Sequence, residues 1–317
     1  MKKIGVIHTG GTISMHMDSS IGAVVPSDQH PLKQENHLLK SYAHIVEFEP
    51  FHLPSPHVTP NEMLHLSLLI KEIAISENLD GVIITHGTDT LEETAYFLDL
   101  ALHLDIPIIL TGAMRSSNEI GADGIYNLIS SIRVAIHPDS KGKGVLVVMN
   151  DEIHSAQNVT KTSTSNVSTF QSPQYGPIGL ITKEDIHFHH MAFQHQRYEV
   201  ESLHGNVFLL KTYAGMESAL LDAVIQLPVK GIVIEGLGQG NVPPSLVPGI
   251  IALRERHVPV IMVSRCYNGI AQPVYGYLGG GKMLEQYGVR FEHGLSGPKA
   301  RIKLLLEISE QHTGFKK

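Results

Sequence analysis

A Gly-Gly-Thr turn near the N-terminus contains the first residues that could do chemistry. Thr9, Gly10, Gly11 and Thr12 follow an apolar run at residues 4–8. Consecutive glycines let a backbone turn sharply and approach a ligand closely. Thr12 then presents a hydroxyl, and N–H groups of the loop could face a developing oxyanion. Because a phosphate cradle or a tight strand-to-helix connection uses the same turn, this loop alone does not define the chemistry.

A second loop places a threonine and an aspartate side by side. Thr88 and Asp89 follow Gly87 at the end of another apolar run, residues 81–86. Acidic residues come next, as the positive end of a helix dipole prefers. A simpler alternative makes Asp89 or Thr90 an N-cap of that helix, with no further role.

Two further loops carry charged residues. Lys161, within residues 159–162, follows a threonine and could be desolvated enough to act as a base, or it could be an ordinary surface lysine. Residues 111–115 end at Arg115, and Asp123 follows shortly after. We interpret Arg115 and Asp123 as a buried pair that shapes the loop.

These loops follow apolar runs that predict buried strands. The runs are continuous and rich in β-branched residues, which is typical of parallel strands covered on both faces. They lie at residues 4–8, 81–86, 106–111, 144–149, 207–211, 231–235 and 258–263. In an open α/β sheet, ligands bind beyond the carboxyl ends of the strands. The loops carrying Thr12 and Thr88 follow such ends.

Amphipathic stretches between the runs predict helices. One begins at a capping box formed by Thr59 and Glu62, and others are predicted at residues 90–104, 124–135, 218–227, 244–255 and 299–309. The alternation predicts an α/β protein: a larger N-terminal domain with a mostly parallel sheet flanked by helices, and a smaller C-terminal α/β domain. A lapse in the apolar pattern predicts these domains at residues 1–185 and 206–317, with a linker at 186–205.

Histidine is unusually frequent, with 20 residues in the chain. The densest group is His187, His189 and His190, with His195 close behind. There is no HExxH pattern and no paired CxxC, so we predict no metal site. We interpret the group as a solvated, polar connecting segment.

Composition limits the classes of partner. A formal charge of -7 and a pI near 6.3 disfavour nucleic acid. Cys266 is the only cysteine, which fits a reducing compartment. The N-terminal apolar run is shorter than the roughly 7–15 residues of a secretory signal, and no window approaches the roughly 20 apolar residues of a membrane span. We therefore expect a cytoplasmic protein whose partners include neither nucleic acid nor a membrane.

Taken together, the loops resemble those of the bacterial-type asparaginase family, which includes glutaminase-asparaginases. Residues 8–13 (HTGGTI) and 84–90 (ITHGTDT) look like its two signature motifs. The resemblance continues, in the expected order, through residues 112–115, 144–151, 159–162, 238–241 and 297–301. It implies a hydrolase that converts L-asparagine to L-aspartate and ammonia, with no metal or organic cofactor.

The resemblance also implies a role for each matching residue. Thr12 is the implied nucleophile and forms an acyl-enzyme that water cleaves. Thr88, Asp89 and Lys161 form the implied second catalytic group. The implied substrate-binding residues are Gly11, Ser55, Gly87, Thr88, Asp89 and Asn241. Asp89 would bind the substrate's α-ammonium and Ser55 its α-carboxylate.

Members of this family are homodimers, or homotetramers built as dimers of dimers. In each dimer, the smaller domain of the partner subunit helps to close the active site. The resemblance therefore implies that Asn241 reaches the site from a second copy of the chain. A lone protomer would then have an incomplete substrate pocket.

The sequence departs from the family pattern in two places. The family usually carries a tyrosine just after the first motif, where it contacts the nucleophile, but residues 14–34 contain none. His16 and Ser27 are candidates to take its place. Pro56 and His57 replace the polar residues that usually follow the substrate-binding serine, and a proline there removes a backbone donor.

Other functions stay open on the sequence alone. The closest alternative is a glutaminase-asparaginase or a hydrolase of D-asparagine or another small amide, because one methylene shifts binding by only about 1–3 kcal/mol. A non-catalytic amino-acid-binding protein is a remote alternative. The acidic balance disfavours a subunit of a tRNA-dependent amidotransferase, and residues 236–240 lack the GxGxxG spacing of a nucleotide-binding oxidoreductase.

Overall fold

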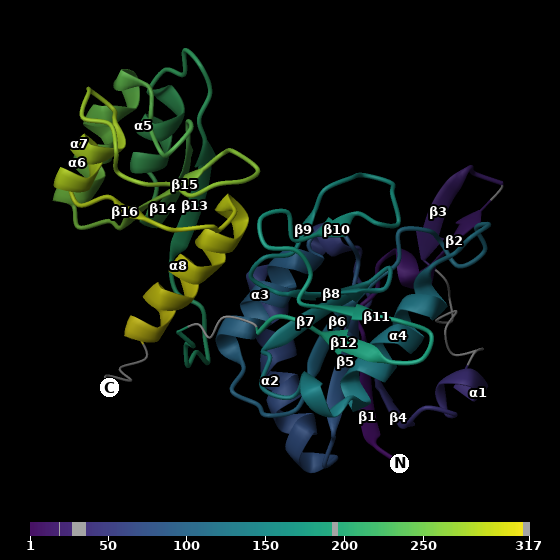
Figure 1. The fold of residues 1–317 in the computed structure, drawn as a ribbon. Helices are drawn as coiled ribbons and strands as arrows, with labels where there is room; N and C mark the ends of the chain where they lie inside the picture. The colour runs from purple at the N-terminus through teal and green to yellow at the C-terminus, as the bar shows by residue number, and fades with distance from the viewer. Residues whose placement is uncertain (19, 27–35, 192–195, 313–317) are drawn as a thin grey trace. The chain divides into compact units, whose positions relative to one another are not determined.

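The computed structural model describes residues 1–18, 20–26, 36–191 and 196–312. It divides into two compact units, Met1–Arg197 and Tyr198–Lys317 (Figure 1). Every apolar run predicted as a strand forms one, with its ends within two residues of the prediction. The main predicted helices also form, within three residues at each end. The two-domain α/β fold predicted from the sequence is therefore confirmed.

The first unit is built on one large sheet. Its strands are β1 (Lys3–His8), β4 (His44–Phe48), β5 (Gly81–Thr85), β6 (Ile108–Thr111), β7 (Val145–Met149), β8 (Glu152–Ser155), β11 (Gly179–Ile181) and β12 (Ile186–Phe188). Among the described residues the sheet has the order β12-β11-β8-β7-β6-β5-β1-β4. Neighbours from β4 through β7 are parallel, whereas β8, β11 and β12 add antiparallel pairs at one edge.

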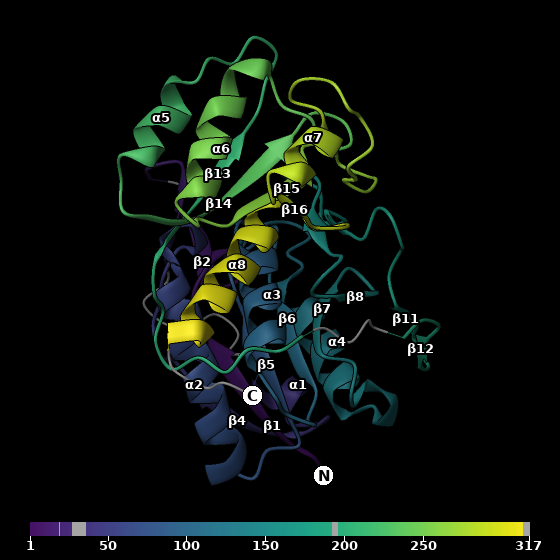
Figure 2. The ribbon, with the colours of Figure 1, turned by 90° about the vertical axis from the view of Figure 1, so that its left-hand side faces the viewer.

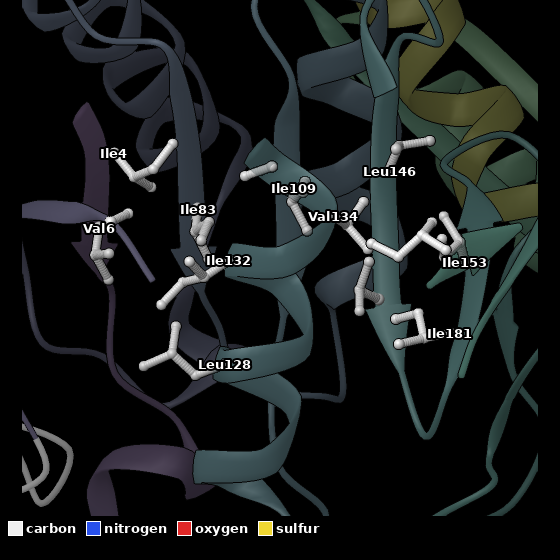
Figure 3. Close-up of a cluster of buried hydrophobic side chains, with 14 of the residues drawn as sticks. Ile4, Val6, Ile83, Ile109, Leu128, Ile132, Val134, Leu146, Ile153 and Ile181 are labelled. Carbon is white, nitrogen blue, oxygen red and sulfur yellow. The ribbon is translucent and has the colours of Figure 1, made fainter. Parts of the chain in front are cut away.

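Helices cover both faces of this sheet. They are α1 (Asn36–Leu39), α2 (Pro60–Ser76), α3 (Leu91–Ala101) and α4 (Gly124–Ile136), with a short helical turn η4 (Pro138–Ser140). Leu128 and Ile132 of α4 pack on Ile83 and Ile109 in the core of the sheet (Figure 3). Helices α2 and α3 lie against the opposite face (Figure 2). Thr59 and Glu62 form the predicted capping box of α2.

Small elements surround the loops at the carboxyl ends of these strands. They are η1 (Thr12–Ser14), the hairpin of β2 (Met15–Asp18) and β3 (Ala23–Pro26), η3 (Ser55–His57), and the pair β9 (Thr160–Lys161) and β10 (Phe170–Gln171). The sequence did not predict the hairpin or the β9–β10 pair, because each strand is too short to show a repeating pattern.

The second unit has its own parallel sheet, β13 (Asn206–Lys211), β14 (Val229–Gly236), β15 (Val260–Ser264) and β16 (Arg290–Phe291). Its helices are α5 (Ala219–Ile225), α6 (Val247–Glu255) after the turn η5 (Pro244–Leu246), α7 (Gly281–Gln286) and α8 (Gly297–His312). Leu221, Leu253 and Leu284 of α5, α6 and α7 share one apolar core with β14 and β15.

Two local features go beyond what the sequence predicts, and one interpretation is wrong. The polar loop after β7 is a hairpin turn into β8, in which Asn150 and Asp151 both have positive φ. Residues 186–188, where the sequence predicts the start of a linker, form edge strand β12, because buried Ile186 alternates with exposed His187. Finally, the carboxylate of Asp123 accepts the backbone N–H groups of Met114 and Arg115 rather than forming a buried ion pair with the Arg115 side chain.

No helix in the described part of the chain is both long and apolar enough to cross a bilayer.

Candidate active site

Glycines bring three loops of the first unit into direct contact. Gly10 and Gly11 follow β1 and have φ values of 106° and 83°. A Cβ on Gly11 would lie 2.2 Å from the Cα of Gly87, in the loop after β5. A Cβ on Gly10 would lie 2.4 Å from the carbonyl oxygen of Leu53, in the loop after β4. Only glycine permits both the left-handed backbone and this close approach.

Thr12 lies at the start of η1, directly after this contact. The Ser14 backbone N–H and hydroxyl both donate to the Gly11 carbonyl, at 2.9 and 2.8 Å, and so hold the turn. Thr12 itself is half-buried. Within the described ranges, its hydroxyl has no hydrogen-bonding partner. The turn therefore presents a threonine oxygen that is available to a ligand.

The loop after β5 carries a second threonine with a different environment. Thr88 is 6% exposed, and the Lys161 ammonium donates to its Oγ1 at 2.9 Å. The same ammonium donates to Asp89 Oδ1 at 2.7 Å. The Asp89 side chain is 60% exposed and that of Lys161 only 17%. A hydroxyl, a cation and a carboxylate are thus assembled where the carboxylate also faces solvent.

The interpretation of Asp89 and Thr90 as simple helix caps is wrong for their side chains. Thr90 is the N-cap residue of α3, but its side chain makes no capping bond. Its hydroxyl instead donates to the Ser55 carbonyl at 2.8 Å. The Asp89 backbone N–H donates to Ser55 Oγ at 3.2 Å. These bonds tie the β5 loop to η3, and Ser55 is buried there at 4% exposure.

His86 is a residue of this loop that the sequence did not single out. Burial lowers its pKa to about 4, so the ring is neutral at pH 7. Because a carbonyl can only accept, Nδ1 carries the proton and donates to the Gly87 carbonyl at 2.8 Å. Nε2 then accepts from the Thr94 hydroxyl at 3.0 Å. A neutral histidine thereby fixes the peptide group next to Thr88.

The β2–β3 hairpin follows Thr12 directly and is fastened to the loop after β6. The Asn118 side chain accepts from the Met17 N–H at 2.8 Å and donates to the Met17 carbonyl at 2.9 Å. Ser117 donates to the Met15 carbonyl. His16, one candidate to replace the usual tyrosine, pairs with Val25 within the hairpin.

Ser27, the other candidate, lies outside the described residues. Pro56 and His57 form η3 together with Ser55, and the Ser55 hydroxyl stays next to the β5 loop.

Asn241 belongs to the second unit, after β14. Its side-chain oxygen accepts from the Gly281 N–H at 3.1 Å, and its amide donates to the Leu237 carbonyl at 3.4 Å. Within its own unit, Asn241 therefore holds a turn.

The histidine group does not form a metal centre in the described residues. No three or more His, Cys, Asp or Glu side chains in that part of the chain are arranged to hold a metal ion. His189 and His190 instead pack ring against ring, with centroids 4.8 Å apart. His195 lies outside the described residues.

Comparison with known proteins defines the family. Residues 3–194 match the family model described as "Asparaginase, N-terminal", and residues 206–314 match "Glutaminase/Asparaginase C-terminal domain". The chain belongs to the asparaginase family. It is therefore an amidohydrolase of the asparaginase type.

Similar proteins support the same assignment over nearly the whole chain. A Deinococcus radiodurans protein named "Probable L-asparaginase" is 37% identical over 98% of this chain and 94% of its own. The "L-asparaginase" of Bacillus licheniformis is 31% identical over 99% and 98%. The crystal structure titled "Probable Cytoplasmic L-asparaginase from Campylobacter jejuni" matches with a TM-score of 0.85 at 30% identity, covering 98% of this chain and 96% of that one.

Proposed function

We propose that this asparaginase-family chain hydrolyses L-asparagine to L-aspartate and ammonia through an acyl-enzyme on Thr12. The observation that carries the proposal is the group formed by Thr88, Lys161 and Asp89, with Lys161 Nζ at 2.9 and 2.7 Å from the two oxygens. It belongs to the same set of touching loops as the Gly10–Gly11 turn. Relatives named L-asparaginase share nearly the full length of the chain.

The chemistry would proceed in two steps. Thr12 Oγ1 attacks the side-chain amide carbon of asparagine, and its proton passes to the departing nitrogen, which leaves as ammonia. Backbone N–H groups of the glycine turn face the oxyanion that forms on the way. A water molecule then attacks the resulting Thr12 ester, which releases aspartate and returns the proton to Thr12.

Thr88, Lys161 and Asp89 would serve proton transfer around these steps. In the present arrangement the ammonium of Lys161 donates to Thr88, so the Thr88 proton can point elsewhere. If Nζ gives up a proton, it can accept the proton of Thr88 instead. Thr88 could then take up and release a proton, and Asp89 would balance the charge on the lysine.

The charges at the site suit an α-amino acid. The Asp89 carboxylate is 60% exposed and has a second oxygen for the substrate α-ammonium. Ser55 Oγ accepts from Asp89 N, which leaves its own proton for the α-carboxylate. The backbones of Gly11 and Gly87 pack against each other next to Ser55, and the missing side chains would let a ligand approach them closely.

We also propose that the active form is a homo-oligomer, a dimer or a tetramer, in which Asn241 of a second copy completes the pocket. We further propose the domain boundaries, the linker and the cytoplasmic location predicted from the sequence. Support for the oligomer comes from the resemblance at residues 238–241.

A glutaminase-asparaginase is the second candidate. The protein of that name from Pseudomonas aeruginosa is 32% identical over 85% of this chain and 77% of its own. Because glutamine is longer than asparagine by one methylene, discrimination between them is limited to about 10–200-fold.

Ammonia release tests these alternatives when L-asparagine, L-glutamine and D-asparagine are supplied side by side. We expect the largest kcat/KM with L-asparagine. A larger value with L-glutamine would favour the second candidate. Asparagine binding by calorimetry without any ammonia release would show a binding protein and refute the proposed hydrolysis.

A further inference from the structure

Lys161 is held at two points by the segment that begins helix α3. Its ammonium contacts Thr88 and Asp89, as described above. Its backbone N–H donates to Glu92 Oε2 at 3.1 Å, across 69 positions of sequence. Glu92 lies in the first turn of α3, four residues after Thr88. Residues 88–92 therefore accept hydrogen bonds from both the side chain and the main chain of Lys161.

The bond to Glu92 gives a partner to the Lys161 backbone N–H, which forms no hydrogen bond within the β9–β10 pair. Lys161 lies opposite Phe170, and the Thr162 N–H bonds to the Thr169 carbonyl at 2.8 Å. Hydrogen-bonded and non-hydrogen-bonded pairs alternate along an antiparallel ladder, so the Lys161 N–H points away from β10. An outward N–H on a short edge strand needs another acceptor. Glu92 supplies it from a different element.

The position of Glu92 suits this task. A carboxylate in the first turn of a helix is stabilised by the positive end of the helix dipole. A charged acceptor forms a stronger bond to an N–H than a neutral one does. Strand β9 is only two residues long, so its ladder alone gives Lys161 little restraint.

We propose that Glu92 is a positioning residue, which fixes the β9 main chain so that Lys161 Nζ stays within hydrogen-bond reach of Thr88. This inference rests on the proposed function for its kinetic consequence. Glu92 acts only through Lys161 and does not contact the substrate.

Steady-state kinetics with L-asparagine test the role of Glu92. We expect Glu92→Ala to lower kcat by about tenfold and to change KM by less than about twofold, because the substrate contacts remain. Glu92→Gln keeps a side-chain oxygen at the same distance and should stay within about threefold of wild type. In a Lys161→Ala background, Glu92→Ala should change kcat by less than about twofold, since coupled residues are not additive.

A merely structural role predicts a different pattern. Glu92→Ala would then lower kcat by the same factor with and without Lys161, and that result would overturn the proposal. Equal losses in Glu92→Ala and Glu92→Gln would overturn it as well.

Hydrogen exchange at the Lys161 amide provides a readout that does not depend on catalysis. We expect exchange at least about tenfold faster in Glu92→Ala, with protection largely kept in Glu92→Gln. Unchanged exchange in Glu92→Ala would refute the main-chain anchor even in an active enzyme. A wild-type protein that releases no ammonia would refute the proposed function, whereas the exchange result would still decide whether Glu92 holds β9.

Discussion

The two threonine hydroxyls of the site differ in what surrounds them. Thr88 is bonded to a lysine and is nearly buried, whereas the Thr12 hydroxyl is left without a protein partner in the described part of the chain. A nucleophilic oxygen must be accessible to the substrate, whereas a proton-transfer group needs partners that change its proton affinity. The environments therefore suit the different roles proposed for Thr12 and Thr88.

His86 makes the stability of the first unit depend on pH. Its pKa of about 4 in the folded protein lies below the ordinary value of 6.5, so the unfolded chain binds the proton more readily. The contribution of His86 to the free energy of unfolding is complete above about pH 6.5. It is lost as pH falls from there towards 4, by up to about 1.4 kcal/mol per pH unit.

Urea unfolding between pH 7 and 4.5 measures this effect. We expect His86→Gln to show a shallower fall in the free energy of unfolding than wild type over that window. His187→Gln, which removes an exposed histidine on β12, serves as the control and should keep the wild-type slope. Parallel curves for wild type and His86→Gln would contradict the assignment.

At the scale of elements, the site depends on short pieces attached to a regular sheet. The parallel strands were predictable because their apolar runs are continuous, and the positions of the loops follow from strand direction. The β2–β3 hairpin was not predictable, since Met15–Asp18 mixes apolar and polar residues over only four positions. Strand β12 was not predicted, because the exposed His187 interrupts its apolar residues and makes the segment look like part of the polar connection.

The candidate site was predictable only in part, for a related reason. Thr12, Thr88 and Lys161 stand out in loops after strands, where hydroxyls and charges suggest chemistry. His86 directly follows a buried strand, and Glu92 resembles any acidic residue at a helix start. Their significance comes from bonds to Thr94 and to the Lys161 main chain, which only the tertiary structure creates.

Asn118 fastens the hairpin that follows Thr12, so it should influence the site without touching it. Asn118→Ala removes both bonds to Met17, and we expect kcat/KM to fall by about fivefold, the equivalent of roughly 1 kcal/mol. Asn118→Asp keeps the acceptor for the Met17 N–H and should lose less. Wild-type kinetics in Asn118→Ala would show that the site does not depend on the hydrogen bonds between Asn118 and the hairpin.

For the whole molecule, the first unit contains every proposed site residue except Asn241. Asn241 already holds a turn within the second unit, so a loss of activity in Asn241→Ala alone could reflect a local change. Mixing two defective variants separates these explanations. If Asn241 acts across a dimer, a heterodimer of Thr12→Ala and Asn241→Ala has one intact site of two.

Random reassembly of the two variants in equal amounts should therefore restore about a quarter of the wild-type sites, because half of the dimers are mixed. Subunits are exchanged under mild dissociating conditions, and ammonia release is compared with that of each variant treated alone. Activity no greater than the sum of the separate variants would place the role of Asn241 within its own chain.

The central claim is that Thr12 is the nucleophile, and ammonia release from L-asparagine by Thr12→Ala tests it most directly. Thr12→Ser keeps a hydroxyl at the same position and serves as the matched control. We predict that Thr12→Ala loses at least about a hundredfold in kcat, while Thr12→Ser keeps measurable turnover. Near-wild-type ammonia release by a correctly folded Thr12→Ala protein would contradict the account.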